Sequence, residues 1–329
     1  MKVLVTGGAG FIGANLIRSL IEHTNYDIHV LSQRNTNPWR LYGMDKEIII
    51  HEVDMADFAR VRQLVLSIRP RAVFHLAAYG GMPNELDQKM IYDVNFYGTI
   101  NLLNVCKEVG FDVFINTGSS SEYGKQNSAM HEDLVLEPIS DYAVAKAAAT
   151  QFCCKEARVS KLPVYTIRPF AIYGDYELNS RLIPTILVGA LHDKPIQLSA
   201  PHYVRDYMYI KDLVSLFLAV MKQKPENHYV FNAGTGVQTS IGHVVATVEH
   251  LLGKKLSVQW GIQTPRPWEP EHWLADTYRT KKVLNWSSQY TLEQGLKESL
   301  AWFKKNISLY AKDSYEDKHA SQSSQATSI

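Results

Sequence analysis

Residues 1–13 read MKVLVTGGAGFIG, and this stretch decides the fold. Lys2–Thr6 is an apolar, β-branched run typical of a buried strand, and the apolar spacing over Phe11–His23 predicts a helix. The turn between them has the pattern G-x-x-G-x-x-G. Its first glycine permits the tight turn, the second lets the backbone approach a pyrophosphate, and the third lets helix and strand pack closely. We therefore expect a dinucleotide to bind at Gly7, Gly10, Phe11, Ile12 and Gly13.

Short β-branched runs alternate with helical periodicity through the first half of the chain. This alternation predicts an α/β fold with a doubly wound parallel sheet of Rossmann type. The further strands that we expect are residues 27–31, 47–53, 72–76, 113–116 and 164–168, and the further helices are 57–68, 85–109 and Asp141–Val159.

The pattern changes after about residue 174, where prolines recur and the expected strands shorten. We interpret residues 1–174 as a nucleotide-binding domain, to which parts of 205–235 return, and 175–310 as a smaller α+β substrate domain. Residues 312–329 are rich in Ser, Gln and Asp, so we expect a disordered tail.

The composition excludes several classes of protein. Lys and Arg number 34 and Asp and Glu 33, and the net charge of +1 argues against a nucleic-acid or polybasic membrane surface. The three cysteines offer neither a disulfide framework nor a zinc-type pair. The chain has no signal-peptide pattern and no run of about 18 apolar residues. We expect a cytoplasmic protein with no metal site.

The end of the second expected strand bears on the choice of dinucleotide. An NAD site usually places an acidic residue there to hold the ribose diol. Here the chain reads Leu31-Ser32-Gln33-Arg34, and Arg34 can pair with a 2′-phosphate, which favours NADP(H) over NAD(H). The alternative is that Arg34 is a solvated loop residue. Asp54 can accept a hydrogen bond from the adenine amino group or cap the next helix.

Tyr142 and Lys146 lie four residues apart in a helical stretch, so their side chains share one face. A free tyrosine has a pKa of about 10, and a nearby ammonium and a positive nicotinamide ring both favour the phenolate. Such a phenol can exchange a proton at a carbinol while hydride moves to or from the ring. The segment Ser119-Ser120-Ser121, about twenty residues earlier, offers a hydroxyl to orient it.

Taken together, these motifs resemble the extended short-chain dehydrogenase/reductase family, in its nucleotide-sugar epimerase/dehydratase group. The resemblance covers roughly residues 1–305. The matching stretches are Thr6 to Gly13, His75-Leu76-Ala77-Ala78, Asn95 to Leu103, Ser119 to Gly124, Tyr142 to Lys146, Arg168-Pro169-Phe170 and Arg205-Asp206-Tyr207.

The resemblance implies a role for each matching position. Ser119 would be the catalytic hydroxyl (with Ser120 as the fallback), Tyr142 the acid/base, and Lys146 the residue that holds the nicotinamide ribose and lowers the tyrosine pKa. Leu76, Ala77, Ala78, Asn95 and Thr117 would line the cofactor. Arg181, Arg205 and Arg266 would neutralise a nucleotide-sugar diphosphate, and Tyr79, Ser120 and Ser121 would face the sugar. The helices at 85–109 and 141–159 would pack against their copies in a homodimer; the alternative is that both are packed only against the sheet.

One departure from the family pattern bears on the reaction. The family's 4,6-dehydratases have an acidic residue one or two positions after the catalytic hydroxyl, where Ser120 and Ser121 stand here. Glu122 comes one place too late, unless a one-residue shift in the loop brings it inward. We therefore favour an NADP(H)-dependent reductase acting at C4 of a nucleotide-linked 4-keto-6-deoxysugar, similar to the branch that makes CDP-abequose or CDP-paratose. The alternative is a nucleotide-sugar 4-epimerase with tightly bound NAD(P). A dehydratase and a non-catalytic nucleotide sensor are the least favoured.

Overall fold

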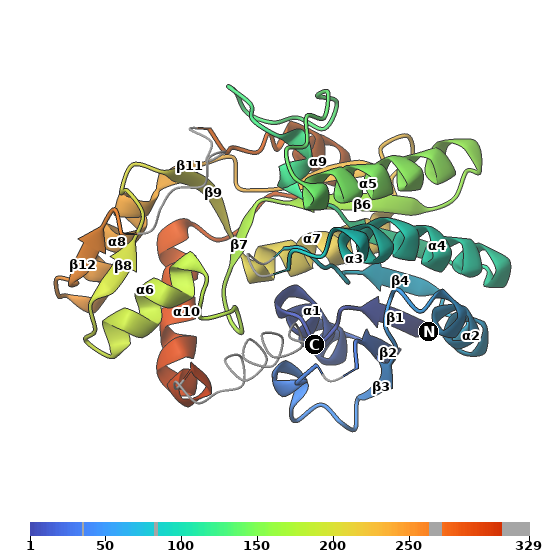
Figure 1. Ribbon diagram of the computed structural model, residues 1–329, viewed down its shortest axis with the longest axis horizontal. Coiled ribbons are helices and arrows are strands. Elements are labelled where there is room, and N and C mark those ends of the chain that lie inside the picture. Colours follow the sequence, from blue (N-terminus) through green and yellow to red (C-terminus); the bar gives the residue numbers. More distant parts are fainter. Residues whose placement is uncertain (35, 82–84, 263–271, 311–329) are drawn as a thin grey trace, which may run out of the picture.

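The structure is a computed structural model that describes residues 1–34, 36–81, 85–262 and 272–310 (Figure 1). Arg266 and the expected tail lie outside these ranges. Within them, no helix is long and apolar enough to cross a membrane.

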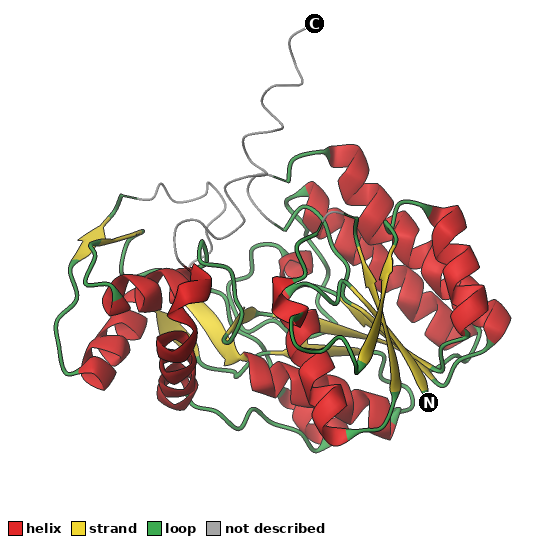
Figure 2. Ribbon diagram, turned by 90° about the horizontal axis from the view of Figure 1, so that it is seen from below, coloured by secondary structure: helices red, strands yellow, loops and turns green. Residues whose placement is uncertain are grey.

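A seven-stranded parallel sheet forms the centre of the molecule (Figure 2). Its strand order is β10-β6-β5-β4-β1-β2-β3. The strands are β1 (Lys2–Thr6), β2 (Asp27–Ser32), β3 (Ile48–Glu52), β4 (Ala72–His75), β5 (Val113–Thr117), β6 (Val164–Pro169) and β10 (Val230–Ala233). The order reverses between β1 and β4, and at such a switch point the carboxyl ends of the strands leave a crevice for a ligand. The Rossmann-type sheet predicted from the sequence is confirmed.

Helices cover both faces of this sheet (Figure 2). α1 (Phe11–His23) packs against α7 (Ile210–Gln223) on one face. On the other face α4 (Gly98–Val109) lies between α2 (Phe58–Ile68) and α5 (Asp141–Val159). Asp57 caps α2 by accepting a hydrogen bond from the backbone of Arg60, so Asp54 remains available for another role.

The long helix expected over residues 85–109 is interrupted. It consists of α3 (Gln88–Tyr92), a π-helical turn η2 (Asp93–Tyr97) and α4. A π turn has a wider hydrogen-bonded ring than the α-helix around it and changes the direction of nearby side chains. Here it contains Asn95, whose amide binds the backbone of Tyr79, and this tertiary contact is not visible in helical periodicity.

The later part of the chain builds a second, smaller group of elements beside the sheet (Figure 1). It has a three-stranded sheet of β7 (Ala171–Tyr173), β9 (Val204–Tyr209) and β11 (Gln238–Ser240), and a strand pair of β8 (Ile196–Leu198) and β12 (Val258–Trp260). Its helices are α6 (Leu182–Leu191), α8 (Ile241–Leu252) and α10 (Leu292–Asn306). The remaining short elements are η1 (Trp39–Leu41), η3 (Ser120–Tyr123), α9 (Tyr278–Leu284) and η4 (Ile307–Tyr310).

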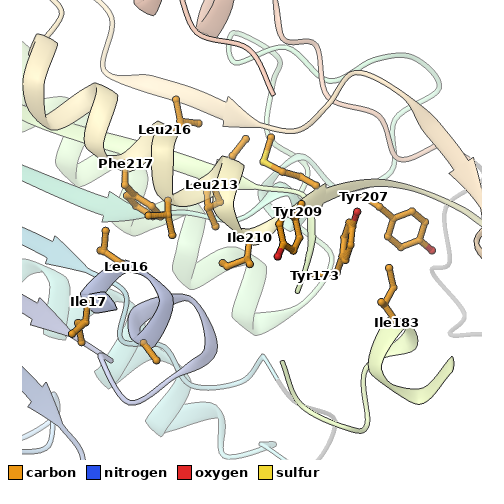
Figure 3. Close-up of a cluster of buried hydrophobic side chains, with 14 of the residues drawn as sticks. Leu16, Ile17, Tyr173, Ile183, Tyr207, Tyr209, Ile210, Leu213, Leu216 and Phe217 are labelled. Carbon is orange, nitrogen blue, oxygen red and sulfur yellow. The ribbon is translucent and has the colours of Figure 1, made fainter. Parts of the chain in front are cut away.

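One apolar core joins the two groups of elements (Figure 3). It runs from Leu16 and Ile17 of α1 through Phe217 and Ile210 of α7 and on to Ile183 of α6. Three tyrosine rings, Tyr173, Tyr207 and Tyr209, lie in its middle. The smaller group of elements is therefore held against the sheet by continuous packing.

Candidate active site

The glycine turn has the geometry that a pyrophosphate needs. Gly7 has a φ of +65°, and a Cβ there would lie 2.7 Å from the backbone of Ala77. A Cβ on Gly13 would lie 2.5 Å from the carbonyl oxygen of Gly7, whereas one on Gly10 would meet only that oxygen, at 3.1 Å. Gly7 and Gly13 therefore serve packing, and Gly10 leaves an open approach. Gly10 starts α1 without a side-chain cap, so the N–H groups of the first turn, at Phe11 and Ile12, are available to an anion.

The adenosine end of the crevice lies at the carboxyl ends of β2 and β3. Ser32 is buried and Arg34 is exposed. Asp54 accepts a hydrogen bond from the side chain of Gln33 at 3.1 Å and one from the backbone of Ala56 at 2.8 Å. Arg34 also lines an open hollow of about 530 Å³ between β3 and α2, which Arg60 lines as well.

The centre of the crevice offers backbone and small side chains. The amides of Leu76 and Ala77 both donate to Thr6 Oγ1 at 3.2 Å, and Ala78 after them is exposed. Thr117 ends β5 with a buried hydroxyl that has no hydrogen-bond partner within the described ranges. A dinucleotide that lies across the switch point would meet the glycine turn, the unpartnered Thr117 hydroxyl and the carboxyl ends of the strands on both sides. These groups fit such a ligand.

His75 belongs to the framework of the site. Its Nδ1 hydrogen-bonds Thr6 Oγ1 at 2.7 Å, and its Nε2 hydrogen-bonds Thr99 Oγ1 at 2.9 Å. Burial and the charge of Lys146 lower the pKa of His75 to about 3, so the ring stays neutral. It ties β1, β4 and α4 together beneath the crevice.

The three predicted catalytic residues come together at the start of α5. The hydroxyl of Ser119 lies near enough to Tyr142 to lower the pKa of its phenol, and Lys146, 3% exposed, follows one helical turn later. Burial raises the pKa of Tyr142 to about 12, and the contact with Ser119 and the charge of Arg181 oppose this rise. Burial lowers the pKa of Lys146 to about 8, against the raising effect of Glu122. The positive charge that acts on the phenol from the protein is thus that of Arg181, whereas the sequence pointed to Lys146.

The serine-rich loop is closed on itself around Glu122. The Ser119 hydroxyl shares a hydrogen bond with that of Ser121 at 2.7 Å, and Ser120 is buried. Glu122 is 0% exposed, and Arg168 Nε donates to its Oε2 at 2.8 Å. This carboxylate points into the protein. A one-residue shift that would bring it to the substrate, as a dehydratase requires, is absent.

The predicted substrate arginines separate into different places. Arg181 donates to the carbonyl of Gly81 at 3.0 Å, and a Cβ on Gly81 would lie 4.0 Å from the ring of Tyr142. Arg181 therefore lies at the reacting end of the crevice. Arg205 lies on β9, with its guanidinium 5.4 Å from the centre of the Trp273 ring. The third arginine, Arg266, is outside the described ranges.

Tyr79 and Asn95 form a clamp at the edge of the site. Asn95 Nδ2 donates to the carbonyl of Tyr79 at 2.6 Å, and the amide of Tyr79 donates back to Asn95 Oδ1 at 3.2 Å. The clamp holds the turn that continues to Gly80 and Gly81 beside Tyr142. Asn95 acts here through the backbone of Tyr79.

The roles of two residues near the site were not predicted from the sequence. Glu122 was considered only as a dehydratase acid, and its partner Arg168 is 46 positions away. Glu177 follows β7 and is 7% exposed, and its Oε2 has no hydrogen-bond partner within the described ranges. Burial raises the pKa of Glu177 to about 8, opposed by Arg181, the Gly174 amide and Arg40. The only sequence signal for either was an acidic residue in the loop that follows a strand.

Comparisons with known proteins agree with this geometry. The model of the NAD dependent epimerase/dehydratase family matches residues 3–234. A UDP-glucuronate 4-epimerase of Thermodesulfobacterium geofontis is 30% identical over 320 residues, which cover 93% of this chain and 97% of that protein.

Two solved structures have the same fold. The UDP-glucose 4-epimerase of Thermotoga maritima, with UDP-glucose, has a TM-score of 0.85 at 26% identity and covers 93% of this chain and 100% of that one. The UDP-glucuronic acid 4-epimerase of Bacillus cereus, with UDP-glucuronic acid and NAD, has a TM-score of 0.81 at 25% identity, with the same coverage.

Proposed function

We propose, from the premise that this chain belongs to the NAD-dependent epimerase/dehydratase family, that it is an NAD-linked 4-epimerase of a nucleotide-diphosphate sugar. Members of this family are enzymes that act on nucleotide-linked sugars. The relatives described above are 4-epimerases, and they favour this reaction over the NADP(H)-dependent 4-keto reductase that the sequence favoured.

The observation that carries the proposal is that Ser119, Tyr142 and Lys146 meet at the start of α5, while the carboxyl of the serine-rich loop, Glu122, does not reach the substrate side. Oxidation and re-reduction at C4 need only one proton acceptor and donor beside the hydride carrier. A 4,6-dehydratase also needs a carboxyl that reaches the sugar. Glu122 is held at 2.8 Å by Arg168 and is fully buried, so it does not supply one.

The chain's own residues handle one proton in this reaction. Bound NAD supplies the hydride acceptor and later the hydride donor at C4. Tyr142, as the phenolate, takes the proton of the C4 hydroxyl, with Ser119 orienting that oxygen. The positive charge of Arg181 stabilises the phenolate and opposes the burial that raises the pKa of Tyr142 to about 12. After the keto sugar has turned its opposite face toward the cofactor, Tyr142 returns the proton to the C4 oxygen.

The residues that would hold NAD are the glycine turn at the pyrophosphate, Ser32 and Asp54 at the adenosine, and Thr117 at the nicotinamide half. Relatives with solved complexes hold NAD, and this supports NAD over NADP. Arg34 is the one feature that favours a 2′-phosphate, because it is exposed at the end of β2 and has no ion-pair partner within the described ranges. A comparison of NAD and NADP affinity in Arg34→Ala decides between them.

The substrate that we infer first is a UDP-hexuronate. Arg181 puts a guanidinium beside Tyr142, where the substituent on C5 of a sugar lies when C4 meets the phenol. A carboxylate at that position pairs with the guanidinium, whereas a hydroxymethyl group does not. Arg205, on the other side of the crevice, remains a candidate for the diphosphate.

We also propose that the chain is a homodimer through α4 and α5. Apolar side chains on and beside this helix pair are exposed: Tyr97 by 50%, Val144 by 39% and Val159 by 75%. Burying them against a second copy removes apolar area from water. Light scattering on Val144→Asp measures whether that face is the interface.

The test begins with the purified chain and UDP-glucuronate, with UDP-glucose in parallel. We expect UDP-galacturonate to accumulate without net change of absorbance at 340 nm. Tyr142→Phe should lose about two to four orders of magnitude in rate, since a positioned acid–base group contributes about 10²–10⁴-fold. Arg181→Ala should lose the preference for the uronate.

Two results would contradict these proposals. Stoichiometric oxidation of NADPH by a nucleotide-linked 4-keto-6-deoxysugar, with no interconversion of C4 isomers, would contradict the epimerase and support the NADP(H)-dependent reductase. A ratio of rates for the two UDP-sugars that is the same in Arg181→Ala as in the natural protein would contradict the uronate assignment and leave the epimerase intact.

A further inference from the structure

Glu122 is a fully buried carboxylate that touches the catalytic loop and takes no part in the proposed reaction. Its Oε1 accepts from the amide of Ser119 at 2.8 Å and from Thr150 Oγ1 at 3.0 Å. Its Oε2 accepts from Arg168 Nε at 2.8 Å. The three donors come from the loop itself, from α5 and from β6, so this single carboxylate ties the loop to the helix and to the sheet.

The pair with Arg168 keeps this carboxylate ionised. Burial raises the pKa of Glu122, and the charge of Arg168, the Ser119 amide and Thr150 oppose that rise. Arg168 is itself 1% exposed and lies 4.6 Å from the centre of the Tyr123 ring. A neutral Glu122 would leave an always-protonated guanidinium buried without a counter-charge, which costs more than ionising the acid.

The carboxylate also fixes the backbone that bears the catalytic hydroxyl. Ser119 and Glu122 form a capping box, in which the Ser119 hydroxyl accepts from the amide of Ser121 while Glu122 accepts from the amide of Ser119. The space is closed on the other side, because a Cβ on Gly118 would lie 2.5 Å from Glu122 Oε1. The position of the Ser119 hydroxyl beside Tyr142 therefore depends on Glu122.

We propose that Glu122 is a positioning residue of the catalytic centre, which holds the Ser119 backbone and hydroxyl in place beside Tyr142. This inference rests on the proposed function for its kinetic readout. Glu122 acts through its neighbours and does not touch the substrate.

The charges around Glu122 allow this role to be measured. The negative charge of Glu122 raises the pKa of Tyr142 and also that of Lys146. The titratable and charged groups that face it are Arg168 of β6, Tyr123 of η3, and Tyr142, Lys146, Cys153 and Cys154 of α5. Removing the charge should lower the pKa of both Tyr142 and Lys146, so both limbs of the pH–rate profile should move to lower pH.

The first variant is Glu122→Gln, which keeps an oxygen for the Ser119 amide and removes the charge. We expect kcat to fall roughly tenfold, since a positioned hydroxyl that loses its fixed geometry costs up to about 100-fold. KM should change little, and the whole pH–rate profile should shift down. If this variant does not fold, because Arg168 is left unpaired, the double variant Glu122→Gln/Arg168→Met removes both charges and should show the same shift.

A second variant, Glu122→Met, removes the acceptor itself and is assessed without turnover. In its crystal structure we expect the loop over residues 119–121 to rearrange and the Ser119 hydroxyl to leave Tyr142. This measurement remains informative if UDP-glucuronate and UDP-glucose are not substrates, so that failure of the proposed function and failure of this inference are distinguishable.

The matched control is Glu156→Gln. Glu156 is another carboxylate of α5, 2% exposed and paired with Lys107 at 2.6 Å, and it lies at the far end of the helix from Tyr142. We expect it to lose stability and to keep the pH–rate profile of the natural protein. If the pH–rate profile of Glu122→Gln has lower rates but the same limbs on the pH axis, then Glu122 has a purely structural role. An undisturbed loop in Glu122→Met would overturn the positioning role as well.

Discussion

Single glycines in the turn after β1 separate cofactor binding from folding. Gly13 has no room for a Cβ, because the carbonyl oxygen of Gly7 lies 2.5 Å from where that atom would be. Gly10 has an extended backbone, with a φ of −74°, that any residue can adopt, and it faces an open approach. The same amino acid is thus needed for different reasons three positions apart.

We predict that Gly10→Ala and Gly13→Ala have opposite signatures. Gly10→Ala should weaken NAD binding by at least about tenfold, because the methyl group stands where the pyrophosphate approaches, and should change the free energy of unfolding by less than about 0.5 kcal/mol. Gly13→Ala should lower the free energy of unfolding by about 1–3 kcal/mol through overpacking. Titration calorimetry with NAD and urea unfolding measure the two effects. Equal loss of stability in both variants would contradict this division.

The sequence predicted the residues of this turn because their geometry is local. Strand, glycines and helix are consecutive, so spacing alone fixes their relation. The contacts of Arg181 with Gly81 and of Glu122 with Arg168 join residues 100 and 46 positions apart. Such contacts depend on how loops after different strands meet above the sheet, and no periodicity encodes that meeting.

Among the elements, the π turn η2 determines the position of the turn from Tyr79 to Gly81 beside Tyr142. It places Asn95 so that its amide bonds both the backbone of Tyr79 and the carbonyl of Ile91, the latter at 2.9 Å. The sequence predicted a helix here and named Asn95 for the cofactor. The interruption was missed because the apolar spacing of a sequence does not distinguish one π turn from the α-helix around it.

We expect Asn95→Ala to lower the free energy of unfolding by about 1–3 kcal/mol, since it leaves the amide and carbonyl of Tyr79 without partners. The loosened turn lies beside Tyr142, so KM for the sugar should rise as well. The matched control is Asn101→Ala on α4, which removes one exposed hydrogen bond to the carbonyl of Phe58 and should cost less than about 0.5 kcal/mol. Chemical unfolding and initial rates would measure both, and similar losses in the two variants would refute the clamp.

Over the whole molecule, the loop after β7 connects the two groups of elements. The carbonyl of Asp175 accepts from Asn15 of α1 at 2.9 Å, and that of Glu177 accepts from the Tyr310 hydroxyl at 2.8 Å. The carboxyl of Glu177 is enclosed by this arrangement, between Arg40 and Arg181. The stability of the assembled molecule should therefore depend on its protonation.

We predict that stability falls as pH rises through the range in which Glu177 loses its proton. Burial raises its pKa in the folded protein to about 8, from a usual value near 4.5, so the folded state binds one more proton between these two values. The stability that this proton provides is complete below about pH 4.5 and is lost as pH approaches 8, at up to about 1.4 kcal/mol per unit. Glu177→Gln should flatten that slope, and exposed Glu47→Gln should not. Urea unfolding at pH 5, 7 and 9 measures it, and parallel slopes in both variants would reject it.

The place of β10 in the sheet has a consequence for how the chain is made. β10 completes the sheet beside β6, yet β6 ends at Pro169 and β10 begins at Val230. As the chain leaves the ribosome, the edge of the apolar sheet at β6 stays unpaired until β10 is made. The elements synthesised in between are β7, α6, β8, β9 and α7. Such an edge pairs readily with other chains. A nascent chain stalled before residue 230 should therefore engage chaperones strongly, and one released after α9 should not.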